Sequence, residues 1–386
     1  MTGAVVNTDP LSPGVIAITK RGAADMVTTT IYSMVSLAED EHLDLKPIHE
    51  FTSYRRAIAL QGNIFVASDV DNIVRLIDTG SGQQICQLRV PLEHDDPTLF
   101  NEEDTCMAVV LVHNHAITFC RRWIHLYKIS NQVDGSSDVP SYLPATSHKW
   151  TWNIDTIVVS PRSLSRIKSD SPSFPLIDIL IRFDTWFPWP VNIIHHYVLP
   201  PNPSLSDARS HSDTFESFEE DHAVQAELPY LFATSSIHGP FMIHSISSPI
   251  RLFTPSDMVL GRYGTALWLD AQSSNSGPAQ AGDHGQRIAG KMLISPRTPP
   301  HTQMRTIKRT EDDKVSPGYA EEQPGNSSSG QAIHEGAIAH EPRMMVFHMQ
   351  DEEDDWSRLA LDEEEGRIAI GTVNGTVLLF EYVPRE

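Results

Sequence analysis

The chain of 386 residues is long enough for one large domain or two medium-sized ones, and its 40% hydrophobic content is that of an ordinary globular protein. Acidic residues outnumber basic ones 50 to 29, which gives a net charge of -21. Such a charge repels nucleic-acid phosphates and anionic membranes, so we expect neither as a partner. The longest apolar run, near Cys106–Leu111, is too short to span a bilayer.

The N-terminal part, residues 1–50, lacks the charged and apolar regions of a secretory signal. We expect it to be partly irregular and able to contribute an early strand. The three cysteines, Cys86, Cys106 and Cys120, are odd in number and have no CxxC spacing. They predict buried thiols in a reducing compartment, the cytoplasm or nucleus, and neither a disulfide framework nor a zinc site.

From residue 51 to 386, short apolar or alternating segments end at Gly, Asn, Asp or Pro, and none keeps a helical period. Val, Ile, Thr and aromatic residues dominate them, as is typical of strands. The predicted strands are Ile64–Ala67, Ile73–Asp78, Gln84–Val90, Ala108–Val112, Ala116–Cys120, Trp123–Ile129, Trp152–Val159, Leu176–Phe183, Asn192–Leu199, Tyr230–Thr234, Phe241–Ile246, Met344–Met349, Ile368–Gly371 and Thr376–Tyr382.

Two polar stretches interrupt this pattern. Residues 200–227 are rich in Ser, Asp, Glu and Pro, and residues 271–341 carry Gly, Ser, Gln and Pro around one short apolar piece at Ile288–Ile294. Both are too polar to offset the entropy of ordering them, so we expect polar insertions, the second largely disordered.

Internal repetition favours a radial array of hairpins over a single sandwich. Val74–Asp78 has relatives in Ile124–Lys128 and Val377–Glu381. The last of these follows Asn374-Gly375, a dipeptide that favours tight hairpins because both residues tolerate positive φ.

The stretch Ser68–Asp78, followed by a Gly-rich turn, resembles one blade of the WD40 family. Ser68 and Asp71 stand where that family braces a turn, and Asp78 stands at its terminal aspartate position. Ile77 replaces the usual tryptophan, and no Gly-His dipeptide precedes the blade. The resemblance implies an all-β, WD40-like β-propeller of about six or seven irregular blades with long polar loop insertions, occupying residues 51–386.

A second resemblance concerns Tyr263–Asp270, Trp356–Asp362 and Gly366–Thr372, which look like parts of the C-terminal region of fungal F-box proteins. It implies the substrate-receptor portion of a ubiquitin ligase, which an N-terminal F-box would join to the adaptor Skp1. Met1–Glu50 contains no leucine- and proline-rich helical F-box, so adaptor binding does not transfer to these residues.

Several side-chain groups are candidates for function. The pairs His113/His115 and His195/His196 lack a further ligand at metal spacing, so we expect no metal or other cofactor. Partner contact is the hypothesis for Trp186, Phe187 and Trp189, with packing between blades as the alternative. Trp356, which stands between two acidic runs, is a fourth candidate for partner contact.

Two acidic runs, Asp351–Asp355 and Asp362–Glu365, are either docks for a basic partner or solvated loops. No common nucleophile, phosphate-binding or metalloprotease motif is present. We therefore expect a non-catalytic scaffold for other proteins, with the F-box substrate receptor and a propeller hydrolase as alternatives. Closure of the ring is expected to pair an early strand with Thr376–Tyr382.

Overall fold

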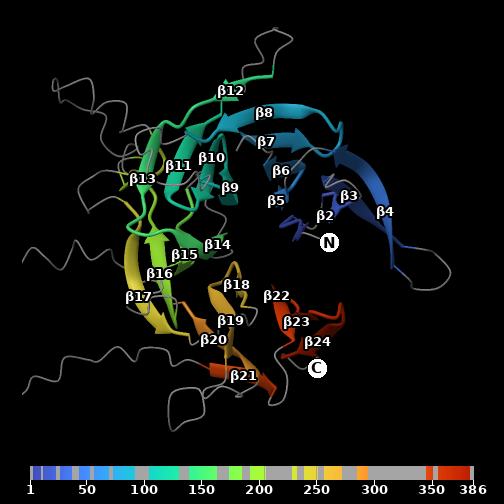
Figure 1. The fold of residues 1–386 in the computed structure, drawn as a ribbon. Coiled ribbons are helices and arrows are strands. Elements are labelled where there is room, and N and C mark those ends of the chain that lie inside the picture. Colours follow the sequence, from blue (N-terminus) through green and yellow to red (C-terminus); the bar gives the residue numbers. More distant parts are fainter. Residues whose placement is uncertain are drawn as a thin grey trace, which may run out of the picture.

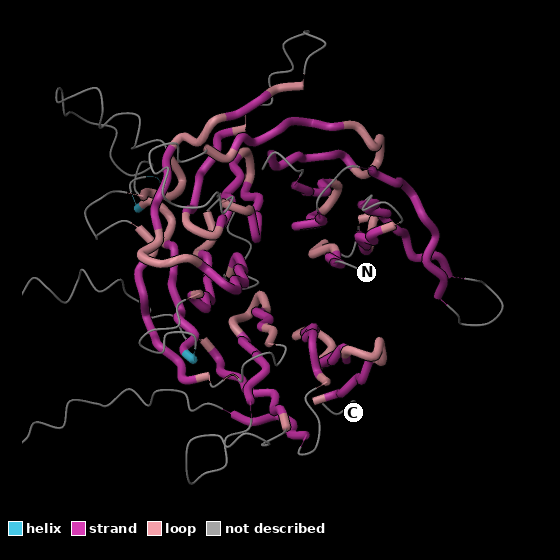
Figure 2. Tube along the Cα trace, in the orientation of Figure 1, coloured by secondary structure: helices cyan, strands magenta, loops and turns pink. Residues whose placement is uncertain are grey.

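Six β-sheets surround one central axis in the computed structural model, so the chain is an all-β propeller, as predicted (Figure 1). Nearly all of the described chain is strand or connecting loop (Figure 2). The described residues are 3–9, 12–22, 27–36, 43–52, 56–68, 73–91, 104–129, 139–162, 174–184, 192–203, 205, 228–232, 239–248, 250, 256–271, 285–293, 345–350 and 355–382. Within these ranges, no helix is long and apolar enough to cross a membrane.

Each sheet is one blade, numbered here from the N-terminus, and its first strand lies nearest the axis. Blade 1 contains β1 (Gly3–Val6), β2 (Ile16–Arg21), β3 (Val27–Ser36) and β4 (Leu43–Thr52). Blade 2 contains β5 (Arg56–Gln61), β6 (Ile64–Ser68), β7 (Ile73–Asp78), β8 (Gln84–Arg89) and β12 (Ser141–Tyr142). Blade 3 contains β9 (Cys106–Val112), β10 (His115–Cys120), β11 (Trp123–Lys128) and β13 (Thr146–Lys149).

The second half of the chain forms the other three blades. Blade 4 contains β14 (Ile154–Pro161), β15 (Ile177–Phe183), β16 (Ile193–Leu199) and β17 (Phe241–Ser247). Blade 5 contains β18 (Met258–Leu260), β19 (Thr265–Ala271), β20 (Gln286–Met292) and β21 (Met345–Gln350). Blade 6 has three described strands: β22 (Trp356–Asp362), β23 (Arg367–Thr372) and β24 (Val377–Glu381).

The chain runs up and down within each blade, with one exception. After β11, it leaves blade 3 and adds β12 in parallel to the outer strand β8 of blade 2, where Ser141 pairs with Gln87. It then returns to blade 3, where β13 pairs with β11. The segment between β11 and β13 therefore crosses to blade 2 and back, and so links blades 2 and 3.

Burial explains which sequences become central strands. β15 is buried along its whole length and reads as an almost continuous apolar run, because both of its faces meet a neighbouring blade. β23 and β2 alternate instead, with only one face fully buried. The central strand of blade 4 therefore has two buried faces, whereas the corresponding strands of the first and last blades have one.

Three strand predictions differ from the structure. Residues 1–50, expected to give at most one early strand, supply the four strands of blade 1. β20 lies inside 271–341, which was assigned to a polar insertion, because its short apolar piece pairs with β19 along its full length. Tyr230, the start of a predicted strand, lies in a loop, and its hydroxyl donates to the carbonyl of Pro175 at 2.6 Å.

Apolar side chains are buried between consecutive blades, and this packing leaves the ring open. Five core clusters lie between blades 1 and 2, 2 and 3, 3 and 4, 4 and 5, and 5 and 6. Among the described residues, no such cluster joins blade 6 to blade 1. The expected pairing of an early strand with Thr376–Tyr382 is wrong for this part of the chain, because β1 and β24 belong to separate sheets.

Candidate interaction site

The seam between blade 6 and blade 1 is the candidate site, and blade 6 forms one of its walls. β24 pairs with β23 on one side, and no described strand pairs with its other edge. Phe380 packs toward blade 5, so the alternating neighbours Val377 and Leu379 face the seam, where they are 67% and 64% exposed. Leu379 lies opposite Ala369. The result is a wall that carries exposed apolar side chains and the Arg367–Glu381 ion pair, beside an edge with which no described strand pairs.

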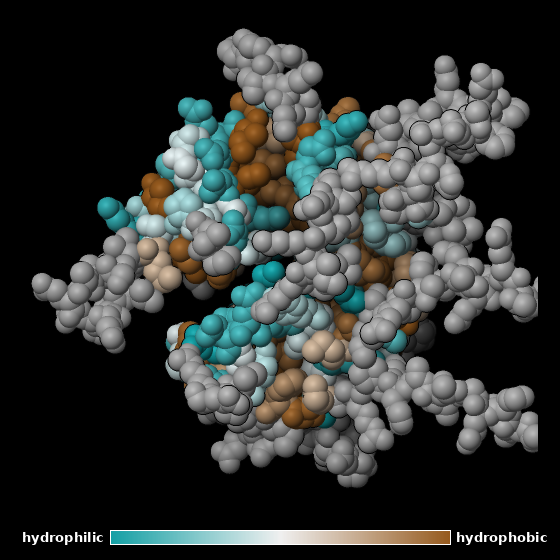
Figure 3. Space-filling view, turned by 180° about the vertical axis from the view of Figure 1, so that it is seen from behind, coloured by the Kyte–Doolittle hydropathy of each residue, from teal (hydrophilic) through white to brown (hydrophobic). Residues whose placement is uncertain are grey.

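Blade 1 forms the opposite wall. Its residues Ala17 and Ile31 pack against blade 2, so the side chains that alternate with them turn to the seam. Three of these are apolar and exposed: Val6 at 63%, Met34 at 50% and Leu45 at 45%. Viewed from behind, an open cleft enters from the left, between blade 1 above and blade 6 below (Figure 3). Two apolar walls thus face one opening.

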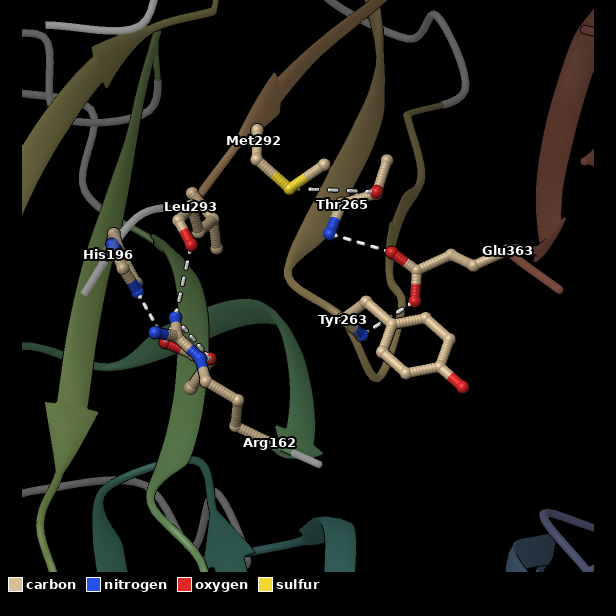
Figure 4. A network of polar contacts seen from close by, with 8 residues as sticks. Arg162, His196, Tyr263, Thr265, Met292, Leu293 and Glu363 are labelled. Atoms are coloured by element: carbon tan, nitrogen blue, oxygen red, sulfur yellow. Dashed lines mark hydrogen bonds and ion pairs between the residues drawn. The ribbon is translucent and has the colours of Figure 1, made fainter. Parts of the chain in front are cut away.

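A polar latch holds blade 6 against blade 5. Glu363, in the turn between β22 and β23, accepts the backbone N–H groups of Tyr263 at 2.7 Å and Thr265 at 2.8 Å (Figure 4). A Cβ atom at Gly261 would lie 2.0 Å from the Glu363 carboxyl carbon, so a larger residue there would displace the Glu363 side chain from this position. Glu364 also accepts the Tyr263 hydroxyl at 2.9 Å. Half of the acidic run Asp362–Glu365 therefore bonds to the neighbouring blade, a role that its charge pattern did not indicate.

A buried ionic group joins blades 4 and 5 near the axis. Arg162 donates two hydrogen bonds of 2.7 Å to Asp178, and its Nη2 also reaches the Leu293 carbonyl of blade 5 (Figure 4). His196 contacts the same carboxylate at 2.9 Å. Asp178 and His196 are fully buried, and only Arg162 of this group is partly exposed, so the group mainly joins the two blades.

A second buried group lies between the same blades. Arg182 donates to Ser248, whose hydroxyl donates to Asp270 at 2.5 Å. Arg287 completes the group with a 3.1 Å ion pair to Asp270. Burial lowers the pKa of Arg182 and raises that of Asp270. Both networks therefore join blade 4 to blade 5.

The inner strands enclose a cavity of about 750 Å³ at the axis. Its lining is mainly apolar and includes Val5, Leu60 and Val158, with the cations Arg162 and Arg262 as its charged members. None of the described lining residues carries a carboxylate.

Most of the predicted turn residues lie where the sequence places them. Asp78 ends β7 and accepts the Ser81 hydroxyl at 2.7 Å, and this bond lowers the pKa of the carboxyl. Asn374 and Gly375 form the β23–β24 hairpin, with Asn374 accepting the Thr376 N–H at 3.0 Å and Gly375 at φ +89°. Ser68 is buried at the end of β6, and its expected bracing partner Asp71 lies outside the described residues.

The predicted contact residues do not form a surface in the described structure. Trp186, Phe187 and Trp189 lie outside the described residues. Trp356 is only 2% exposed, because it begins β22 inside the blade 5–6 core, and its backbone bonds to the Gln286 side chain. Its assignment as a partner contact is therefore wrong for this structure, because the ring is packed between blades 5 and 6.

The four histidines considered as metal ligands are separated in the fold. His113 lies in the β9–β10 turn with φ 51°, while His115 is buried at the start of β10. His195 and His196 point to opposite faces of β16, and His196 bonds to Asp178. Neither pair forms a ligand set among the described residues.

Comparisons with known proteins show weak likeness of fold only. No family model matches the chain, and no curated protein matches it. Among solved structures, the WD40 domain of Toxoplasma gondii coronin is similar with a TM-score of 0.40 and 10% identity, over 99% of this chain and 67% of that one. The β-propeller domain of Cps50 (Swd1) from Myceliophteria thermophila gives 0.45 and 8%, over 98% and 83%.

A putative 6-phosphogluconolactonase from Bacteroides fragilis gives a TM-score of 0.44 and 8% identity, over 98% of this chain and 89% of that one. These likenesses are too low to carry an argument about family or function. The fold assignment therefore depends on the sheet order and core of this chain itself.

Proposed function

We propose that this propeller is a non-catalytic scaffold whose seam binds a partner protein in β-conformation. The observation that carries the proposal is the pair of exposed apolar walls, led by Leu379 on blade 6 and Met34 on blade 1, beside the unpaired edge of β24. A partner strand that joins β24 would extend the sheet of blade 6 at the edge with which no described strand pairs, while alternate apolar side chains of the partner would contact the exposed apolar residues of the two walls.

The chemistry of the partner follows from that of the seam. It is a polypeptide segment with alternating apolar residues, because Val377 and Leu379 present every second side chain of β24 to the opening. Nucleic acid is disfavoured by the net charge of -21. We also propose a cytoplasmic or nuclear location, which the buried free thiols Cys86, Cys106 and Cys120 support.

The test compares Leu379→Lys with Leu143→Lys. Both side chains are exposed, at 64% and 71%, so neither change should alter the free energy of unfolding by more than about 0.5 kcal/mol. A partner captured by the wild type and by Leu143→Lys should be lost with Leu379→Lys. Hydrogen exchange of the complex should protect the amides of β24.

Equal capture by all three proteins would refute the seam as the binding site. A concentration-dependent dimer that Leu379→Lys abolishes would replace the partner with a second copy of this chain. Sedimentation equilibrium of the purified protein distinguishes these outcomes.

A more specific version of the proposal is the F-box alternative, in which the propeller presents substrates for ubiquitin ligation. It is supported by the resemblance of Tyr263–Asp270 and Trp356–Asp362, which here form parts of blades 5 and 6. Stable co-purification with Skp1 would support it. Other stable partners in the absence of Skp1 would favour the free scaffold.

A further inference from the structure

Three residues with metal-binding side chains meet at the end of blade 3, where it packs against blade 2, and a fourth, Cys106, pairs with one of them across the strands. One ligand atom each of Asp104, Cys120 and His125 lie within 4.8 Å of one another. Cys106 is the cross-strand partner of Cys120 on β9, and its thiol donates to the Ala108 carbonyl at 3.6 Å. Asp104 lies in the loop before β9, Cys106 begins β9, Cys120 ends β10 and His125 lies in the middle of β11.

Burial gives this cluster the character of a built site. Cys106, Cys120 and His125 are 1%, 0% and 2% exposed. The His125 ring meets the Ser147 hydroxyl through Nδ1 at 2.7 Å, while its Nε2 has no hydrogen-bond partner among the described residues. An unpaired nitrogen is costly in such a place, and polar atoms buried this deeply nearly always have a partner.

The arrangement around the ring is that of a metal ligand. Histidines that bind metals usually donate one ring N–H to a neighbouring group, which fixes the tautomer and leaves the other nitrogen for the cation. Ser147 is positioned to accept from Nδ1 in this way.

We propose that Asp104, Cys120 and His125 bind one divalent cation of the zinc class, with Cys106 as the fourth ligand. Sulfur, nitrogen and oxygen donors in a tetrahedral set are typical of zinc. Asp104 is held by the Arg122 N–H, which donates to its Oδ1 at 2.7 Å. The cation would join the loop before β9 to β10 and β11, beside the blade 2 residues of the same core.

Sequence spacing hides this set. Cys106 and Cys120 are far apart in the chain and meet only because β9 pairs with β10 in this register. Cys86 provides a matched control, since it is a buried cysteine of the same core, on β8, and is not among the clustered ligands.

The experiment titrates the purified, chelator-stripped full chain with Co²⁺ under reducing conditions. The wild type and Cys86→Ser should each bind one equivalent and show thiolate-to-cobalt charge-transfer absorption. Cys120→Ser and His125→Gln should bind at least about tenfold more weakly, the loss that even changes behind the ligands cause. Zn²⁺ should displace Co²⁺ from the wild type.

Asp104→Asn covers the case in which a core variant fails to fold, because it keeps the acceptor for Arg122 and lies in a partly exposed loop. Circular dichroism checks that it is folded, and it too should bind at least about tenfold more weakly. The proposal is overturned if the folded wild type binds no equivalent of Co²⁺, or if His125→Gln and Asp104→Asn bind as tightly as wild type. A Cys106–Cys120 disulfide in the protein isolated from its cell would also overturn it.

Discussion

The Glu363 latch predicts how firmly blade 6 is attached to the rest of the ring. Glu363→Ala removes the acceptor for two backbone N–H groups, those of Tyr263 and Thr265, and leaves the Thr265 donor partly buried. A hydrogen bond to a charged acceptor contributes about 1.5–3 kcal/mol when buried. Because Glu363 is half-buried and water can replace part of the interaction, we expect a loss of about 2 kcal/mol in the free energy of unfolding.

Guanidinium-induced unfolding, followed by tryptophan fluorescence, measures this loss. Trp268 and Trp356 are both buried, on the two blades that the latch connects, so their emission reports on this junction. Glu365→Ala is the matched control, because Glu365 lies in the same turn, its side chain is 58% exposed, and it forms a 3.6 Å surface ion pair with Arg367. We expect the control to change stability by less than about 0.5 kcal/mol.

Equal stability of Glu363→Ala and Glu365→Ala would refute this reasoning. Gly261→Ala adds an independent check, since its Cβ would collide with the Glu363 carboxyl group. If the collision acts through the latch, combining Gly261→Ala with Glu363→Ala should cost less than the sum of the two single changes. Full additivity would show that the glycine acts through something other than the latch.

Three further predictions concern the core and one turn. Asp178→Ala should lower stability by about 3–5 kcal/mol, because it leaves Arg162 and His196 buried without their carboxylate; thermal unfolding checks this. Gly375→Ala should lower the free energy of unfolding by about 1 kcal/mol, since φ is +89° there. Thr376→Ala, next to it in the same hairpin, should leave the melting temperature nearly unchanged. Burial lowers the pKa of His115 to about 4, below its value of about 6.5 in the unfolded chain, so stability should fall as pH decreases from 6.5 to 4. In His115→Gln, the free energy of unfolding should fall by about 2 kcal/mol less between pH 7 and pH 5 than in the wild type. An equal fall in both proteins would contradict the assignment of this pH dependence to His115.

The sequence predicts the strands of the middle blades well and the first blade poorly. Ile73–Asp78 is predicted with its observed bounds, because it is bounded by turn residues and buried between two blades. β3 and β4 have the sequences VTTTIYSMVS and LDLKPIHEFT, whose polar residues obscure the alternation. They lie at the open end of the ring, where one face has no neighbouring blade to demand apolar residues.

The candidate sites depend on contacts that no local pattern contains. The two walls of the seam come from opposite ends of the chain, so Met34 and Leu379 meet one cleft only because of the radial arrangement. Cys120 and His125 come together only through the strand register of blade 3, which the local sequence does not reveal. By contrast, the turn at Asn374-Gly375 is visible in the sequence, because two adjacent residues determine its geometry.

Because β12 follows β11 in the chain but pairs with blade 2, blade 2 can be completed only after most of blade 3 has been synthesised. The outer edge of β8 has a pairing partner only once Ser141–Tyr142 has been synthesised, and by then three strands of the next blade have already emerged. An emerging chain folds from its N-terminus, so part of the outer edge of β8 stays unpaired on the ribosome until β12 has been synthesised. Ribosome-bound chains that end before Ser141 should therefore aggregate more readily than chains that extend past Lys149.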